Sequence, residues 1–213
     1  MTEFIAARWQ DILFRSYQHT SLVIQSVAVA LIIALVIAIF VAQRPRGAAL
    51  ANALSSIGLT LPSLALLGLA IPLFGIGTVP SVVLVVFYAV LPILRNAIVG
   101  LHTVDPAVIE SARGQGMSSA AILFRIRLPL AWPIIMTGIR VATQMSMGVA
   151  AIAAYALGPG LGGYIYSGLS QIGGTNALNY TLVGTLGVVV IALIVDAILA
   201  GIQKLTTPKG ISA

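Results

Sequence analysis

The side chains that could do chemistry in this chain are few, and many of the charged ones lie in one polar segment between His102 and Pro129. The sequence holds 5 acidic residues, 11 basic residues, 2 histidines and no cysteine. The lack of cysteine excludes disulfides, iron–sulfur clusters and thiolate catalysis. His19 and His102 are expected at opposite membrane faces, outside the apolar stretches, which excludes a haem site or a Ser–His protease site between spans. The remaining chemistry is electrostatic, namely ion pairing and docking.

Composition indicates an integral membrane protein. Hydrophobic residues make up 59% of the 213 residues and charged residues 8%, whereas a soluble domain carries about 25% charged residues. The net charge of +6 does not indicate nucleic acid as a partner, because the basic residues are scattered beside apolar stretches rather than clustered. They are better interpreted as topology signals in a lipid bilayer.

Apolar stretches predict an all-α fold with five transmembrane helices in a single domain, residues 1–213. The first stretch, Leu22 to Ala42, has 21 residues without a charge, too many for a signal peptide. A turn is expected at Gly75 to Pro80, and Pro62 is expected to kink or end a helix. The predicted spans are 22–42, 50–74, 80–101, 130–157 and 182–202, with a loop at 102–129.

The distribution of Lys and Arg predicts the orientation. Basic residues follow the first span, lie between the third and fourth spans, and follow the fifth span. The loops after the second and fourth spans are uncharged. These basic residues are Arg44, Arg46, Arg95, Arg113, Arg125, Arg127, Lys204 and Lys209. We therefore expect the N-terminus outside, the C-terminus in the cytoplasm, and loop 102–129 in the cytoplasm.

Local signals predict that this loop is folded. Asp105 is a good N-cap and Pro106 a good first helical residue, so a short helix is expected from Pro106 to about Arg113. Gly116 is suited to a left-handed cap, and Ser118 to the start of a second helix. Without further information, an amphipathic loop at the membrane interface explains the same pattern.

The spacing of residues in the loop adds a resemblance. The pattern Glu-Ser-Ala, three residues, Gly, nine residues, Ile-x-Leu-Pro resembles the EAA signature of permease subunits of binding-protein-dependent ABC importers, with Ser111 where the signature has Ala. The resemblance implies a cytoplasmic coupling helix in a groove of the ATPase, a polar contact at Glu110, and a methionine-importer-like permease core. The implied coupling residues are Asp105, Glu110, Ser111, Ala112, Gly116, Ile126, Leu128 and Pro129.

Other segments between residues 90 and 170 resemble osmoprotectant permeases, which take up glycine betaine, carnitine or choline. Gly158-Pro159-Gly160 departs from the Gly-Ala-Gly usual there. An ABC permease for methionine or another small amino acid shares much of this scaffold and is the first alternative. An ion-coupled secondary transporter, whose broken helices also contain Gly and Pro, is the second.

The resemblance also implies partners and a location. These are two cytoplasmic ATP-binding subunits, a second permease copy or a related permease, an extracytoplasmic substrate-binding protein, and a multi-pass position in a bacterial-type cytoplasmic (inner) membrane. The sequence lacks the Gly-x4-Gly-Lys-Ser/Thr phosphate loop. We therefore expect no enzyme activity, cofactor or metal in this chain, with ATP and Mg in the partner ATPase.

Two charges lie inside predicted spans, Arg140 and Asp196. Charges at such depth are usually paired or face an aqueous path. Asp196 could attract a cationic solute, but pairing with Arg140 or Arg95 is the preferred interpretation.

Residues near the outer ends of the spans are candidates for an outer gate, namely Tyr155, Gly158 and Gly160. With Tyr164 and Tyr166, Tyr155 could bind a quaternary ammonium group through aromatic faces. Tyrosines of the interfacial belt explain the same residues and are preferred.

Overall fold

The computed structural model describes residues 1–207, and the secondary-structure elements within them are helices. Lys209, one of the basic residues used to predict orientation, lies outside the described residues. The long helices are α1 (Thr2–Val41), α2 (Pro45–Thr60), α3 (Ser63–Phe74), α4 (Thr78–His102), α7 (Leu128–Ile152) and α9 (Ala177–Thr206). The short ones are α5 (Pro106–Gly114), α6 (Ser119–Ile122), the π-helical turn η1 (Leu123–Arg127), the 3₁₀ turn η2 (Ala153–Ala156) and α8 (Gly162–Ser170).

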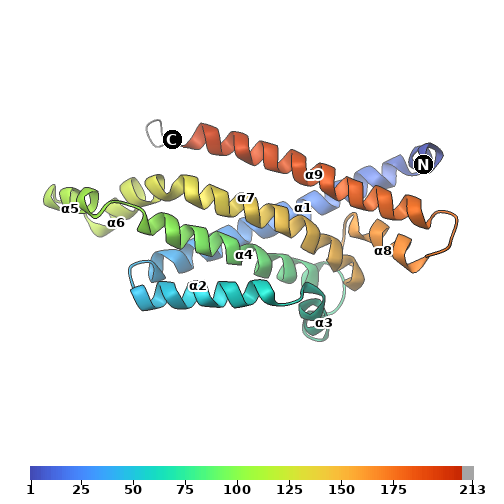
Figure 1. Ribbon diagram of the computed structural model, residues 1–213, viewed down its shortest axis with the longest axis horizontal. Coiled ribbons are helices and arrows are strands. Elements are labelled where there is room, and N and C mark those ends of the chain that lie inside the picture. The colour runs from blue at the N-terminus through green and yellow to red at the C-terminus, as the bar shows by residue number, and fades with distance from the viewer. Residues whose placement is uncertain (208–213) are drawn as a thin grey trace.

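The chain runs along the bundle five times. Figure 1 shows α1, α2, α4, α7 and α9 along the long axis, with α5, α6 and the end of α9 at one end and the N-terminus, α3 and α8 at the other. Within residues 1–207, four helical segments are long and apolar enough to span a membrane, namely α1, α4, α9 and the segment Ser119–Ala156 that contains α7. The bent pair α2 and α3 makes up to five. The all-α, five-span fold class is therefore confirmed. The predicted N-out orientation remains a prediction.

The core lies where α1, α4 and α7 meet. Helix α1 buries alanines at four-residue spacing, Ala30, Ala34 and Ala38, so its backbone approaches its neighbours closely. The backbones of α4 and α7 also approach each other closely. A Cβ atom added to Gly138 on α7 would lie 2.6 Å from the Cβ of Asn96 on α4. The packed pair α4 and α7 therefore forms a stiff centre that joins both ends of the molecule.

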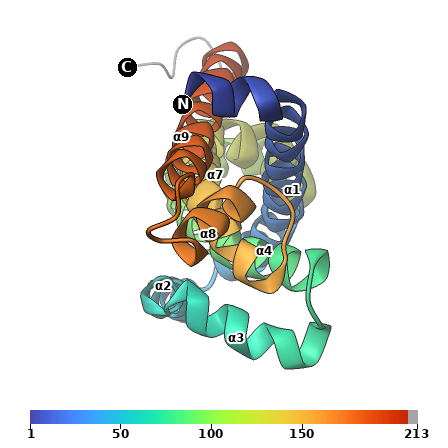
Figure 2. The same cartoon turned by 90° about the vertical axis from the view of Figure 1, so that its right-hand side faces the viewer.

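The second apolar stretch differs from the single span predicted at 50–74. Helix α2 ends at Thr60, α3 begins at Ser63, and the two are bent by 94°. The bend occurs because Leu61 precedes Pro62, and a residue before proline is pushed out of the helical region; Leu61 is extended, with ψ of 133°. The carbonyl of Leu61, freed by the bend, accepts a hydrogen bond from the Tyr88 hydroxyl. Helix α3 thus lies across the bundle end (Figure 2).

Helix α1 starts much earlier than the apolar span predicts. It is helical from Thr2, about 20 residues before Leu22. At 1.5 Å per residue its 40 residues would measure about 60 Å if straight, about twice the hydrocarbon thickness of a bilayer. Helix α1 is therefore longer than a single crossing of the hydrocarbon layer requires.

Candidate functional site

The loop between α4 and α7 folds at the end of the bundle as the local signals predict. The Asp105 carboxylate accepts a hydrogen bond from the Ala107 backbone N–H at 2.8 Å and caps α5, with Pro106 in the first turn. Gly116 has a φ of +80°, which glycine adopts without strain. The Ser118 hydroxyl accepts from the Ala121 N–H at 3.2 Å and caps α6. Three separate local devices therefore hold α5 and α6 in place.

The exposure of α5 divides the predicted coupling residues into two groups. Glu110 and Ser111 are exposed, whereas Ala112 is buried, with 5% of its surface accessible. Ala112 thus lies on the side of α5 that packs against the rest of the chain, whereas Glu110 and Ser111 face outward. A hollow of about 400 Å³ lies beside this face, lined by Ala107, Val108, Ser111, Ala112, Gln115, Met117 and Ile126.

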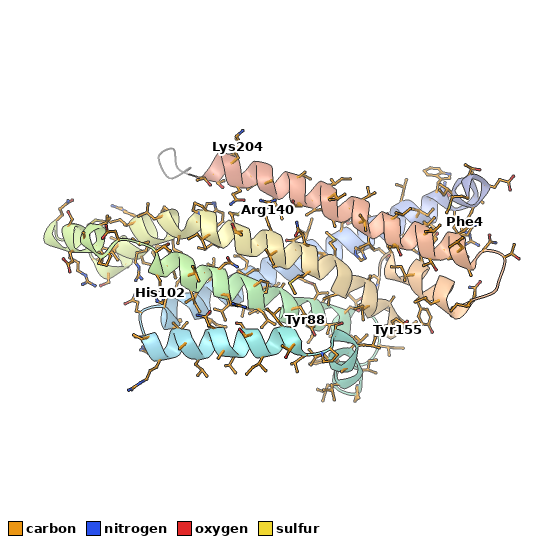
Figure 3. The ribbon with its side chains drawn as sticks, viewed as in Figure 1. Phe4, Tyr88, His102, Arg140, Tyr155 and Lys204 are labelled. Atoms are coloured by element: carbon orange, nitrogen blue, oxygen red, sulfur yellow. The ribbon has the colours of Figure 1, made fainter. Side chains whose placement is uncertain are left out.

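The last part of the predicted signature joins the loop to α7. Ile126 lies in the π-helical turn η1, and Leu128 and Pro129 form the first turn of α7, so the chain enters the core helix without a break. Arg127 donates a hydrogen bond to the carbonyl of Leu101 at 3.0 Å. This bond ties the loop to the end of α4, where Figure 3 places His102. Sequence reasoning missed the Arg127 contact, which has no signature in spacing.

The two charges inside the spans lie together. Arg140 of α7 donates from Nε and Nη2 to the two carboxylate oxygens of Asp196 on α9, both at 2.9 Å. Figure 3 shows Arg140 where α7 and α9 run side by side. Arg140 also reaches the amide oxygen of Gln203 at 3.3 Å, and Gln203 in turn donates to the Pro133 carbonyl at 3.1 Å. The sequence pattern did not single out Gln203.

The predicted outer-gate residues lie at the opposite end of the bundle. Tyr155 is 50% exposed and meets the Tyr166 ring edge to face, with centroids 5.0 Å apart; Figure 3 places Tyr155 at the end near α8. Tyr164 does not join them. It is 2% exposed and donates to the Asp11 carboxylate at 2.6 Å. Burial first, and then this hydrogen bond, raise the pKa of Tyr164 above its ordinary value.

The two predicted gate glycines are held by packing. Gly160 has a φ of +115°, and a Cβ atom there would lie 2.8 Å from Nδ1 of the buried His19. A Cβ atom on Gly158 would lie 2.7 Å from the carbonyl oxygen of Ala153. Close contact therefore explains why both positions are glycine, and the loop is seated on α1 and η2.

Comparison with known proteins agrees with this geometry. Residues 7–207 match the model of a family described as binding-protein-dependent transport system inner membrane component. The chain is 35% identical over 210 residues to the choline transport system permease protein OpuBB of Bacillus subtilis, covering 99% of this chain and 95% of that protein. It is 36% identical over 211 residues to the glycine betaine/carnitine/choline transport system permease protein OpuCB of the same species, with the same coverage.

A solved structure shows the fold. An inward-facing conformation of the MetNI methionine ABC transporter matches with a TM-score of 0.79 at 21% identity, covering 92% of this chain and 96% of that chain. The helical bundle of this chain therefore has a fold already known from an ABC transporter. The chain belongs to the family of inner membrane components of binding-protein-dependent transport systems and is a multi-pass protein of the bacterial inner membrane.

Proposed function

We propose that the chain is the transmembrane subunit of an ATP-driven importer for a small quaternary ammonium osmoprotectant such as glycine betaine, carnitine or choline. The observation that carries this proposal is the similarity of nearly the whole chain to permeases named for these solutes. The methionine transporter shares the fold at lower identity, which supports the architecture but does not favour methionine as the solute.

Helix α5 is the element that would receive force from a cytoplasmic ATPase. It lies at the bundle end, is capped by Asp105, and presents Glu110 and Ser111 outward. A carboxylate on an exposed helix face suits a hydrogen-bonded or ionic contact in a protein groove. ATP hydrolysis belongs to that partner in this proposal, and the permease supplies no catalytic group.

Movement of α5 would pass directly to the core. The loop is bonded to the end of α4 by Arg127 and is continuous with α7 through Leu128. Since α4 and α7 pack closely along their length, a tilt of α5 would turn both helices together rather than bend the loop. Such rigid-body motion is a common way for a small local change to alter a whole bundle.

The transport path would require a second permease, either another copy of this chain or a related one. Each permease would bind one ATPase, and ATP binding would close the ATPase pair and favour the outward-open state. A separate binding protein would then deliver the solute at the other end, near Tyr155, Gly158 and Gly160. The ion pair of Arg140 and Asp196 would hold α7 to α9 during this motion.

Uptake measurements test the proposed function. The permease is reconstituted in proteoliposomes with its ATPase and binding protein, with ATP inside or outside, and radiolabelled glycine betaine, choline, carnitine and methionine are compared. ATP-dependent uptake of the quaternary ammonium solutes is expected. Uptake of methionine alone would contradict the solute assignment, and uptake that needs an ion gradient but no ATP would favour a secondary transporter.

Glu110→Ala gives a sharper test in the same assay, with Glu3→Ala as the matched control, because both glutamates are exposed and lie at opposite ends of the chain's bundle. Loss of a charge-assisted hydrogen bond of about 1.5–3 kcal/mol would weaken ATPase docking roughly 10- to 160-fold. Uptake at limiting ATPase should fall with Glu110→Ala and be unchanged with Glu3→Ala.

A further inference from the structure

The start of α1 carries many exposed apolar side chains although it precedes the apolar span. Residues 1–17 include a charged face, so neither their composition nor the span prediction assigns them to the membrane. Several bulky apolar side chains in this segment are nevertheless exposed. Their exposed fractions are Met1 47%, Ile5 42%, Trp9 53%, Leu13 59%, Phe14 59% and Tyr17 69%.

These side chains are ordered on the helix. Ile5, Trp9 and Leu13 recur every four residues and form one exposed apolar stripe. A second face docks on the bundle, because Phe4 is 8% exposed and meets the Tyr180 ring edge to face at 4.8 Å. Glu3 and Gln10 lie on a further exposed side, which helical spacing makes them share with Phe14. The segment thus has one side on the bundle, one exposed apolar stripe, and one exposed side of mixed character.

Specific contacts hold this arrangement. Asp11 accepts hydrogen bonds from the Tyr164 hydroxyl at 2.6 Å and from Arg15 at 3.0 Å. Tyr164 lies on α8, so Asp11 joins the first part of α1 to α8 at the bundle end. These contacts therefore determine the direction in which the exposed apolar stripe points.

The orientation of the segment matches a membrane surface. Figure 2 shows the first turns of α1, in dark blue, lying across the end of the bundle rather than along its long axis. Since the long helices cross the membrane, a segment perpendicular to them lies roughly in the membrane plane. An amphipathic helix in that plane buries its apolar side at the boundary of headgroups and acyl chains.

The chemistry of the exposed side favours lipid over protein as the occupant. Further along α1, beyond the less exposed residues 18–23, the span also presents bulky apolar side chains outward, with Ile32 65% and Phe40 69% exposed. Trp9 and Tyr17 are the residue types enriched at membrane interfaces. The Arg8 guanidinium lies over the rings of Phe4 at 5.2 Å and Tyr180 at 5.0 Å. Within residues 1–207 its side chain makes no hydrogen bond or ion pair, so its N–H donors can meet a lipid phosphate at the bundle end.

We propose that residues 1–17 form an interfacial segment bound to the lipid leaflet at the end of the bundle opposite α5. In this arrangement Ile5, Trp9 and Leu13 lie at the boundary of headgroups and acyl chains, and Arg8 contacts phosphate groups. The proposal does not depend on the transported solute or on which leaflet faces the cytoplasm.

The absence of native cysteine makes a direct accessibility test possible. Ile5→Cys and Leu13→Cys are compared with the matched control Gln10→Cys, in the reconstituted transporter in bilayers, using a water-soluble maleimide. A thiol in apolar surroundings has a raised pKa, and each unit lowers the thiolate fraction about tenfold. Cys at positions 5 and 13 should therefore react at least about tenfold more slowly than Cys at position 10. Equal rates at all three positions would overturn the proposal.

Two further measurements separate lipid from protein as the occupant. In a Trp132→Phe background Trp9 is the only tryptophan, and its fluorescence should be quenched strongly by phospholipids brominated near the headgroup and weakly by those brominated deep in the acyl chain. Quenching by aqueous iodide but by no brominated lipid would contradict lipid contact. A disulfide between two Ile5→Cys copies, or protection of that thiol by added binding protein, would assign the stripe to a protein partner instead.

Discussion

Removing one member of the Arg140–Asp196 ion pair is expected to destabilise the permease more than removing both. The changes are Arg140→Gln, Asp196→Asn and the double variant, each of which keeps the approximate size of the side chain. In the native protein two hydrogen bonds of 2.9 Å join the two groups, and the side chains are 33% and 21% exposed. Each single change leaves the other charge without its ionic partner, although Arg140 keeps a neutral hydrogen-bond partner in the Gln203 amide oxygen at 3.3 Å.

The magnitude follows from that geometry. An unpaired charge at the centre of a membrane helix costs about 2.5–3.5 kcal/mol, and the partial exposure of this pair reduces the expected loss to about 2 kcal/mol for each single variant. The double variant buries two neutral amides that can still bond to each other, at a loss of about 1 kcal/mol. The coupling energy of the cycle is then about 3 kcal/mol, at the upper end for residues in contact.

The assay is reversible unfolding in mixed micelles with increasing SDS, which reports the free energy of unfolding of each variant. A loss of about 2 kcal/mol corresponds to a roughly 30-fold change in the unfolding equilibrium constant. The exposed Arg95 gives a matched control: Arg95→Gln combined with Asp196→Asn should be additive within about 0.5 kcal/mol. A double variant at positions 140 and 196 that is no more stable than the worse single variant would refute the pairing.

Three other outcomes follow from the packing and the caps. Gly138→Ala places a methyl group against Asn96 and should lower stability by about 1–3 kcal/mol in the same unfolding assay, whereas Gly148→Ala, which meets nothing within 4 Å, should change it little. Asp105→Ala removes the cap of α5 at a cost of about 1 kcal/mol, so hydrogen exchange of the α5 amides should be about fivefold faster. Tyr164→Phe loses the bond to Asp11 and about 1 kcal/mol. Burial, and then that bond, raise the pKa of Tyr164 from its ordinary value of 10.0. The stabilising contribution of Tyr164 is therefore present below pH 10 and is lost as the pH rises through the folded-state pKa. Above pH 10 the free energy of unfolding should fall more for the native protein than for the Phe variant.

The folded loop could be predicted from sequence because its determinants are local. Asp105, Pro106, Gly116 and Ser118 each act on backbone groups within a few residues, and the structure uses three of them as caps or turns and Pro106 in the first helical turn. Such signals mark where a helix begins and ends without reference to its distant contacts. The burial of Ala112 could not be predicted in this way, because it depends on how the loop meets the bundle.

Features that depend on direction or on distant partners were harder to predict. Apolar length alone predicted one span at 50–74, since hydrophobicity reports how much chain avoids water and not where it turns; Pro62 marked the break but not its 94° angle. The charge at Asp196 required a partner, and the choice of Arg140 over Arg95 came from three-dimensional packing. The contact between Asp11 and Tyr164 joins residues 153 apart and leaves no local pattern.

The most direct test of the account is cross-linking of α5 to the ATPase. Ser111→Cys is the best site, because Ser111 is exposed beside Glu110 and Ala112 is buried; Thr175→Cys, exposed between α8 and α9, is the control at the other end. With single cysteines scanned along the ATPase groove in membranes, we expect a disulfide from position 111 whose yield changes with ATP, and none from position 175. No cross-link from position 111 to any groove position in an intact complex would contradict the assignment of α5 as the coupling helix.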